Sequence, residues 1–188
     1  MEGRMPLSGG IRPWSYLWRK PGRIATVSGV ILSVSSRVFD ESWRHATTLE
    51  EKAQLVELTM DRLPSDDLAW FGIADGPVSD DELTSDTWLA VAVNKTAGYG
   101  ALMWCVDSRS PRRGGTNEHV WLTDNPRPPK VDPQVVANPD AGLIHSPRST
   151  LPRLQIRLAV EEFCYGDTGD RPERVSWARG DLNGHRHD

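Results

Sequence analysis

The sequence has few cysteines, little net charge and no long apolar run, and each shortage excludes a class of protein. Cys105 and Cys164 are too few for a zinc site built on cysteine pairs or for a secreted disulfide scaffold. No apolar run approaches the roughly 18 residues that span a bilayer. A net charge of −4 over 188 residues argues against a general nucleic-acid-binding domain. We therefore expect no membrane span, no direct nucleic-acid partner, and two thiols that are reduced and half-buried.

The familiar signatures of enzymes are also missing. The chain contains no glycine-rich phosphate loop, no Gly-x-Ser-x-Gly elbow and no His-Glu-x-x-His pair. It lacks the paired motifs of the zinc deaminases as well. His119 has no second catalytic group at a meaningful spacing, and Cys164 follows two glutamates that would raise its thiol pKa. The sequence predicts no catalytic residue, no metal ligand and no cofactor.

The length fits one domain, for which about 150 residues is usual. We expect an N-terminal tail over residues 1–23, a single α+β domain over 24–180 and a polar tail over 181–188. Residues 1–23 carry five basic side chains against Glu2, and an apolar stretch, 24–34, follows them. This outline is that of a signal peptide. Val30, Leu32 and Val34 alternate with Ile31, Ser33 and Ser35, as in a strand with one buried face, and this interpretation is favoured over the signal peptide.

Two segments carry the apolar spacing of a helix. Residues 47–50 fit a capping box, in which a threonine hydroxyl and a glutamate satisfy free backbone N–H groups at the helix start. The first helix is expected to end before Pro64 and to bury one stripe: Leu49, Ala53, Val56, Met60 and Leu63. The second is expected to have Pro152 in its first turn, to stop at Gly166 and Gly169, and to bury a wide face: Leu154, Ile156, Leu158, Ala159, Val160 and Phe163.

Strand-like runs surround these helices. Four of them, each with a tryptophan, form a predicted meander: 68–73, 88–93, 99–106 and 119–123. Residues 111–152 hold 8 of the 14 prolines and are expected to cross the sheet irregularly. A short strand over 175–177 completes the chain. The sum is an α+β fold, with a mostly antiparallel sheet of about five to six strands and two main helices in the order β-α-β-β-β-β-α-β.

Charge is unevenly distributed along the chain. Eight acidic residues between positions 61 and 86 are opposed by Arg62 alone. The ordinary interpretation of such a run is a solvated loop with helix-capping aspartates. The functional interpretation is a negative patch that steers a basic partner. A second charged group is basic and comprises Arg109, Arg112, Arg113, Arg127 and Lys130. These residues could contact an acidic partner or form ion pairs with the acidic loop over 75–86, and the sequence leaves both alternatives open.

The last third of the chain carries a recognisable motif. A helix that ends with Glu162-Phe163 leads into Thr168-Gly169-Asp170-Arg171-Pro172 and then Val175-Ser176-Trp177. This order resembles immunity protein family 1 of bacterial polymorphic toxin systems. The glycine-led run over 98–102 is similar to a sheet strand of that family, and the resemblance extends over residues 24–179.

The resemblance implies a small cytoplasmic protein that binds and neutralises a cognate toxin by occluding its active site. In this family the toxin is often a nucleic-acid-modifying enzyme such as a deaminase, whose cleft would be basic. No catalytic residue is carried over. The shared motif is interpreted as scaffold, in which Glu162 or Arg171 makes an ion pair, and its members are Glu162, Phe163, Gly169, Arg171, Pro172 and Trp177.

We expect the acidic loop to be the surface that binds the toxin. The predicted contacts are Asp75, Asp80, Asp81, Glu82 and Asp86, with Trp88 or Trp70 near the centre, since tryptophan is enriched among binding hot spots. An alternative is a non-catalytic interaction module or adaptor without a toxin. A third is an enzyme in which the proline-rich segment closes over His119 or His145.

Overall fold

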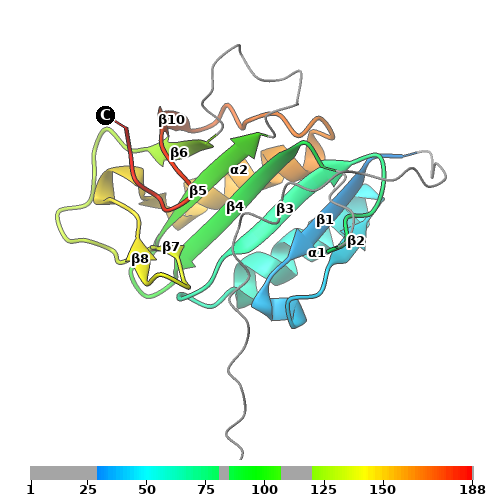
Figure 1. Ribbon diagram of the computed structural model, residues 1–188, viewed down its shortest axis with the longest axis horizontal. Helices are drawn as coiled ribbons and strands as arrows, with labels where there is room; N and C mark the ends of the chain where they lie inside the picture. The colour runs from blue at the N-terminus through cyan, green and yellow to red at the C-terminus, as the bar shows by residue number, and fades with distance from the viewer. Residues whose placement is uncertain (1–28, 81–84, 107–119, 188) are drawn as a thin grey trace, which may run out of the picture.

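The computed structural model describes residues 29–80, 85–106 and 120–187, which form an antiparallel sheet with two helices packed on it (Figure 1). The predicted α+β class is confirmed. The main sheet has eight strands: seven run in the order β10-β6-β5-β4-β3-β1-β2, and β9 pairs with the start of β5. This is more than the five or six expected. Several of the additional strands have only two or three residues, too few to show a periodicity in the sequence.

The elements follow the predicted chain order, with the short strands added. The strands are β1 (Ile31–Ser35), β2 (Arg44–Ala46), β3 (Ala69–Ala74), β4 (Thr87–Asn94), β5 (Tyr99–Val106), β6 (Val120–Asp124), β7 (Val136–Asn138), β8 (Leu143–Ile144), β9 (Leu151–Pro152) and β10 (Ser176–Arg179). The helices are α1 (Leu49–Arg62) and α2 (Arg153–Tyr165), with short 3-10 turns η2 (Arg37–Phe39) and η3 (Pro147–Ser149). β7 and β8 form a separate hairpin. The apolar stretch over 24–34 was interpreted as a strand, and the structure has β1 from Ile31 on, while residues 24–28 lie outside the described part of the chain.

A capping box begins α1, one residue later than expected. The Thr48 hydroxyl accepts the backbone N–H of Glu51 (3.2 Å), and the Glu51 carboxylate accepts the backbone N–H of Thr48 (3.0 Å). The sequence offers two overlapping Thr-x-x-Glu spacings, and the structure uses the second. Leu63 follows the last helical residue, as the proline after it predicts.

Both helices pack on one side of the sheet, which we call the helix face. Its core includes Val56 and Met60 of α1, and Ile156, Val160 and Phe163 of α2. The expectation that Leu49, Leu154 and Leu158 are buried is wrong: they are 65%, 67% and 37% exposed. A helix lying on a sheet buries one face only. Leu154 and Leu158 lie on the outer face of α2, and Leu49 lies in the exposed first turn of α1.

The opposite side of the sheet, which we call the loop face, is covered by irregular segments instead of helices. Because side chains alternate along a strand, residues next to core residues of the helix face point to this side. They form two smaller clusters, one around Trp88 and Met103 and one around Ala92 and Ala101. The covering segments contribute Val78, Val135 and Leu182. In Figure 1 the hairpin of β7 and β8 and the C-terminal segment lie on the side of the sheet away from α1 and α2.

Candidate functional site

Tryptophans concentrate on the loop face next to β1. Trp43 precedes β2, and its ring centroid lies 5.7 Å from that of Trp88 on β4, with the planes inclined by 52°. Trp88 lies over Gly72 on β3, so closely that a Cβ on that glycine would be 2.7 Å from the Trp88 ring. Trp70 packs against the same cluster. Trp88 is 7% exposed, whereas Trp43 and Trp70 are half-buried.

The chain after β3 brings carboxylates to these tryptophans. We call residues 75–80 the acidic segment. Val78 is buried and its backbone N–H donates to the Ser33 hydroxyl (3.2 Å), which holds the segment against β1. The indole N–H of Trp43 then donates to a carboxylate oxygen of Asp80 (3.1 Å). The segment therefore folds back over the loop face.

These residues form one surface, which we call the tryptophan–aspartate patch and define as Trp43, Trp70, Trp88, Asp75, Asp80 and Asp86. Asp75 and Asp80 are exposed, and Asp86 is half-buried immediately before β4. The structure thus brings Trp88 and Trp70 together in one cluster and places Asp80 beside it. Asp81 and Glu82, also expected to contact the toxin, lie outside the described residues. Trp43 was missed by the sequence prediction, because it lies in an irregular segment with no periodic neighbours.

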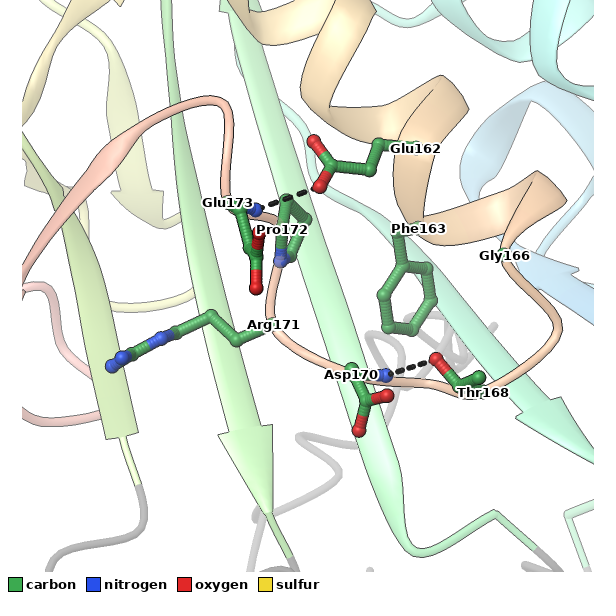
Figure 2. A pocket seen from close by; sticks show the side chains of 8 residues that line it. All are labelled: Glu162, Phe163, Gly166, Thr168, Asp170, Arg171, Pro172 and Glu173. Atoms are coloured by element: carbon green, nitrogen blue, oxygen red, sulfur yellow. Dashed lines mark hydrogen bonds between the residues drawn. The ribbon is translucent and has the colours of Figure 1, made fainter.

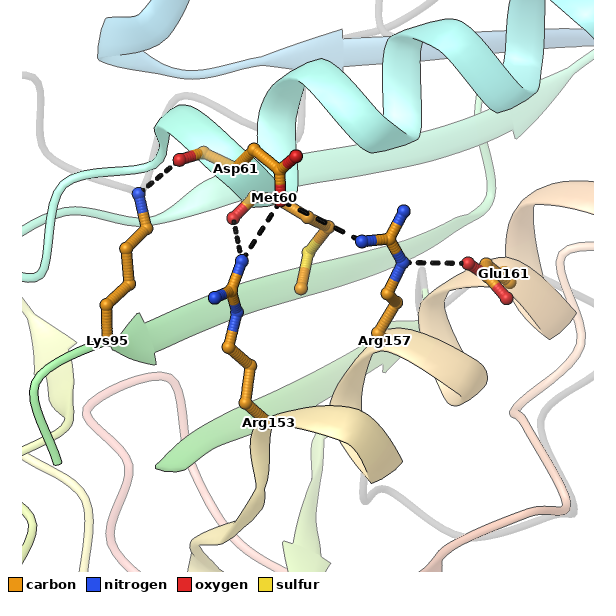
Figure 3. Close-up of polar contacts among 6 residues, drawn as sticks. All are labelled: Met60, Asp61, Lys95, Arg153, Arg157 and Glu161. Atoms are coloured by element: carbon orange, nitrogen blue, oxygen red, sulfur yellow. Dashed lines mark hydrogen bonds and ion pairs between the residues drawn. The ribbon is translucent and has the colours of Figure 1, made fainter. Parts of the chain in front are cut away.

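The rest of the acidic run does not belong to this patch. Figure 3 shows that Asp61, near the end of α1, meets Arg153 of α2, whose guanidinium donates to its carboxylate (3.0 Å). Arg157 lies 3.8 Å from the same carboxylate, and Lys95 donates to the backbone oxygen of Asp61. Asp67 forms an ion pair with Arg37 (3.2 Å). These carboxylates join parts of the fold, so only the second half of the run supplies the patch.

The C-terminal motif forms a turn that packs on three tryptophans. The Arg171 guanidinium carbon lies 4.2 Å from the ring centroid of Trp121 and 5.9 Å from those of Trp104 and Trp177. The indole N–H groups of two of these rings donate to the turn itself: Trp104 to the carbonyl of Gly169 (3.2 Å) and Trp177 to that of Pro172 (2.7 Å). Partial burial lowers the pKa of Arg171.

Glu162 holds the other side of this turn. Its carboxylate accepts the backbone N–H groups of Glu173 (2.8 Å) and Arg174 (3.2 Å) and forms an ion pair with Arg174 (3.6 Å). Of the two candidates for an ion pair, Glu162 forms one; Arg171 is held by aromatic rings. Arg171 is one of the residues that line a pocket of about 220 Å³ beside Glu162, and Figure 2 shows its side chain pointing away from the other side chains drawn there. Phe163 is buried in the core.

Three groups that could carry chemistry, Cys105, Cys164 and His145, are buried. Both cysteines are fully buried rather than half-buried, and burial raises the pKa of both thiols, that of Cys105 to about 12. Burial lowers the pKa of His145 to about 4. His119 lies outside the described residues. Within the described part of the chain, no group of three or more His, Cys, Asp or Glu side chains could hold a metal ion.

Comparison with known proteins gives one match. A model of the family described as "Immunity protein Imm1" matches residues 37–179, most of the chain. The expected resemblance covered residues 24–179, so the match has the same last residue but begins at residue 37 instead of 24. It includes both the tryptophan–aspartate patch and the C-terminal turn. No curated protein and no solved structure matches the chain. Among the described residues, no helix has the length and apolar character needed to cross a membrane.

Proposed function

Because this chain belongs to the Imm1 family of immunity proteins, we propose that it binds a cognate bacterial toxin and neutralises it by covering the toxin's active site. A tight inhibitor needs about 1,600 Å² of well-fitted surface. One face of a chain of this size is sufficient for that area.

The proposed docking surface is the tryptophan–aspartate patch. The observation that carries this choice is the hydrogen bond from Trp43 to Asp80, since it places a carboxylate directly beside a half-buried indole. Such a pair combines the two features of a docking surface, an aromatic anchor and a charge that steers encounter. Asp75, Asp81, Glu82 and Asp86 extend the negative charge along the same loop in the proposed contact.

The two half-buried tryptophans are the better anchors. Trp88 is largely covered by the surrounding chain, so in this arrangement it supports the patch from below. Trp43 and Trp70 keep part of their rings accessible. We therefore place Trp70 and Trp43 in contact with the toxin, with Trp88 as the base on which Trp43 rests.

The chemistry of the patch favours a toxin with a basic cleft. A cleft that holds nucleic-acid phosphates attracts carboxylates in the same way, so the acidic segment can occupy the place of the phosphates. This supports a nucleic-acid-modifying toxin of the deaminase-like class, released as part of a polymorphic toxin system. The complex would then form in the cytoplasm, where such a toxin reaches its nucleic-acid target.

We propose that the protein acts as an inhibitor and not as an enzyme. The structure brings Ser33 and His45 within 2.9 Å of each other, a distance at which a serine could be activated by a histidine. Ser33 is fully buried, however, and its oxygen already accepts the Val78 N–H. A substrate could not reach it. The pair therefore supports a structural role.

Co-expression tests the immunity function directly. The product of the gene immediately upstream is expressed alone and together with this chain, and cell survival is scored. Death without the chain and survival with it are expected. A neighbour that is harmless alone, or that never co-purifies with the chain, would favour the alternative of an interaction module without a toxin.

Charge reversal tests the docking surface. Asp75→Lys combined with Asp80→Lys should slow association with the toxin and reduce survival, and the effect should shrink at high salt because screening weakens exposed charges. The matched control is Glu50→Lys with Glu57→Lys, which reverses two exposed carboxylates on α1. If both pairs protect as well as the unmodified protein, the toxin docks elsewhere.

Truncation of the tryptophans separates binding from folding. Trp70→Ala should weaken the complex by at least about 2 kcal/mol, as expected for a hot spot, while the far-UV circular dichroism stays unchanged. Trp88→Ala should lower the free energy of unfolding instead, because it removes a buried ring. Equal loss of binding in Trp70→Ala and in an exposed control, Leu154→Ala on α2, would contradict the assignment of the patch.

A further inference from the structure

β10 is the last strand at one end of the main sheet, and β6 pairs with one of its two edges. The C-terminal segment turns back and covers part of the other edge. The backbone N–H of His187 donates to the carbonyl of Arg179 (3.0 Å), and Gly180 and Arg186 form a β-bridge. Among the described residues, no strand pairs with this edge before Arg179. The first half of the edge is therefore open.

The register of β10 on β6 shows which backbone groups face the open edge. Gly180 is opposite Val120, and its N–H donates to the Val120 carbonyl (3.1 Å). In an antiparallel pair, alternate residues exchange hydrogen bonds with the partner strand. Ser176 and Ala178 therefore face β6 as Gly180 does. Trp177 lies between them, so its backbone N–H and carbonyl point to the open edge.

A cation without a polar partner lies beside this edge. Trp177 packs against the core of the helix face, and the guanidinium carbon of Arg171 lies 5.9 Å from its ring centroid. Among the described residues, no hydrogen bond or ion pair engages the five N–H donors of this guanidinium. Figure 2 shows Arg171 pointing away from Glu162, Asp170 and Glu173. The indole rings position the guanidinium, and its donors are available to a partner.

A carboxylate is the group that these donors fit, because a guanidinium binds a carboxylate through two parallel hydrogen bonds. Arg179 is opposite Trp121, and its guanidinium carbon lies 5.8 Å from the Trp121 ring, so a second positive charge lies on the same side. Arg171 is half-buried, where charges are screened less than in water. A phosphate would also fit the donors, but only a peptide fits the open backbone groups of Trp177 as well.

We propose that the edge of β10 at Trp177 binds an extended peptide segment of a partner protein, and that Arg171 binds a carboxylate of that segment. The segment adds a strand to the sheet through backbone hydrogen bonds to Trp177, the mode called β-augmentation. Side chains that are directly opposite each other in an antiparallel pair lie on one face of the sheet. The residue opposite Trp177 therefore lies on the side of Arg171, and a glutamate at that position supplies the carboxylate.

The covered half of the edge excludes a second copy of this chain as the occupant. Two β10 strands centred on Trp177 and related by a twofold axis would place Val175 of one copy beside Arg179 of the other, where His187 already lies. The inference also goes beyond the proposed function. β10 is at the end of the sheet away from β2, which follows Trp43, so this site does not overlap the tryptophan–aspartate patch.

Hydrogen exchange of the full chain tests the open edge. The Ala178 amide donates to β6, whereas the Trp177 amide faces outward. Relative to intrinsic rates, Trp177 should exchange at least about tenfold faster than Ala178, the scale of one hydrogen bond. Equal protection of the two amides would show that the edge is already covered and would overturn the inference.

Titration with a designed peptide, followed by NMR, tests the ligand. The probe is acetyl-Thr-Glu-Thr-Val-Thr-amide, which in antiparallel pairing places its glutamate opposite Trp177 and ends before His187. The amide resonance of Trp177 should move, and so should the Nε–H resonance of Arg171. The same peptide with glutamine in place of glutamate should bind about fivefold more weakly, because it lacks the charge-assisted hydrogen bond. An unmoved Trp177 resonance, or equal affinity for the two peptides, would contradict the proposal.

A variant with a matched control assigns the preference for glutamate to one arginine. Arg171→Gln should bind the two peptides equally. Arg174→Gln, which changes an exposed arginine on the same turn, should keep the fivefold preference. Equal loss of the preference in both variants would overturn the role of Arg171. If Arg171→Gln does not fold, the Arg171 resonance of the unmodified chain decides, since only the glutamate peptide should move it. All these measurements omit the toxin, so their outcome is separate from that of the proposed function.

Discussion

The guanidinium of Arg171 lies over the ring of Trp121, 4.2 Å from its centroid, and meets no carboxylate among the described residues. Cation–π attraction in a partly desolvated position contributes about 1–2 kcal/mol, and the aliphatic part of the arginine adds packing. The C-terminal turn is therefore fastened to the sheet through aromatic rings. A charge pair between Glu162 and Arg171 has no part in it.

Arg171→Ala should lower the free energy of unfolding by about 2 kcal/mol, since it removes both the cation and its aliphatic stem. Arg171→Lys should recover only part of this loss, because an ammonium group cannot stack on a ring. Urea denaturation measures both. The control is Arg174→Ala on the same turn, whose exposed pair with Glu162 should be worth less than about 1 kcal/mol. Equal costs at the two arginines would refute the role of the aromatic rings.

Gly72→Ala should destabilise the fold by about 1–3 kcal/mol, the usual cost of overpacking. The added Cβ would meet the Trp88 ring at 2.7 Å, so the ring must move and Trp43 loses its support. Thermal unfolding and tryptophan fluorescence measure the two effects. Gly76→Ala, where a Cβ would meet nothing within 4 Å, is the matched control. Recovery of stability in Gly72→Ala with Trp88→Phe would identify the ring as the obstacle.

Stability should decrease as the pH falls below about 6.5, in part because of His145. Burial lowers the pKa of His145 to about 4, and its Nδ1 has no hydrogen-bond partner. The unfolded state therefore binds the proton first, and the stability contributed by the neutral ring, at most about 3 kcal/mol, is lost progressively between pH 6.5 and pH 4. Denaturation at several pH values, with and without His145→Gln, measures this contribution. A slope that the substitution leaves unchanged would assign the loss to other groups.

The capping box of α1 also loses stability on acidification, but over a lower pH range than His145. Hydrogen bonds from the backbone N–H groups of Thr48 and Thr47 lower the pKa of Glu51 to about 2. The carboxylate stabilises the helix above its unfolded pKa of 4.5, and that stability is lost as the pH falls from 4.5 toward 2. Titration of the Glu51 carboxyl by NMR checks the value. Thr48→Ala should cost about 1 kcal/mol as a lost N-cap, and Thr47→Ala is expected to cost less.

Much of this fold could be read from local pattern. Strand alternation located β3 to β6 within one or two residues, and the proline after Leu63 located the end of α1, because these signals depend only on neighbours in the chain. Burial was predicted less well. Leu154 and Leu158 have apolar side chains of the kind found in a core, yet both are exposed. Which face of α2 packs on the sheet depends on how the helix is placed, and local pattern does not determine that placement.

The sequence by itself determined the two helices, the longer strands and the acidic character of the segment after β3, since each follows from residue types at short spacing. Tertiary structure alone decided which acids form the patch. Asp61 and Asp67 form ion pairs with arginines from other elements. Asp80 instead accepts a hydrogen bond from Trp43, which lies 37 residues earlier in the chain. That contact exists because Val78 is buried and Ser33 holds its backbone against β1. Long-range hydrogen bonds of this kind leave no periodicity in a sequence, so they become visible only when the chain is folded.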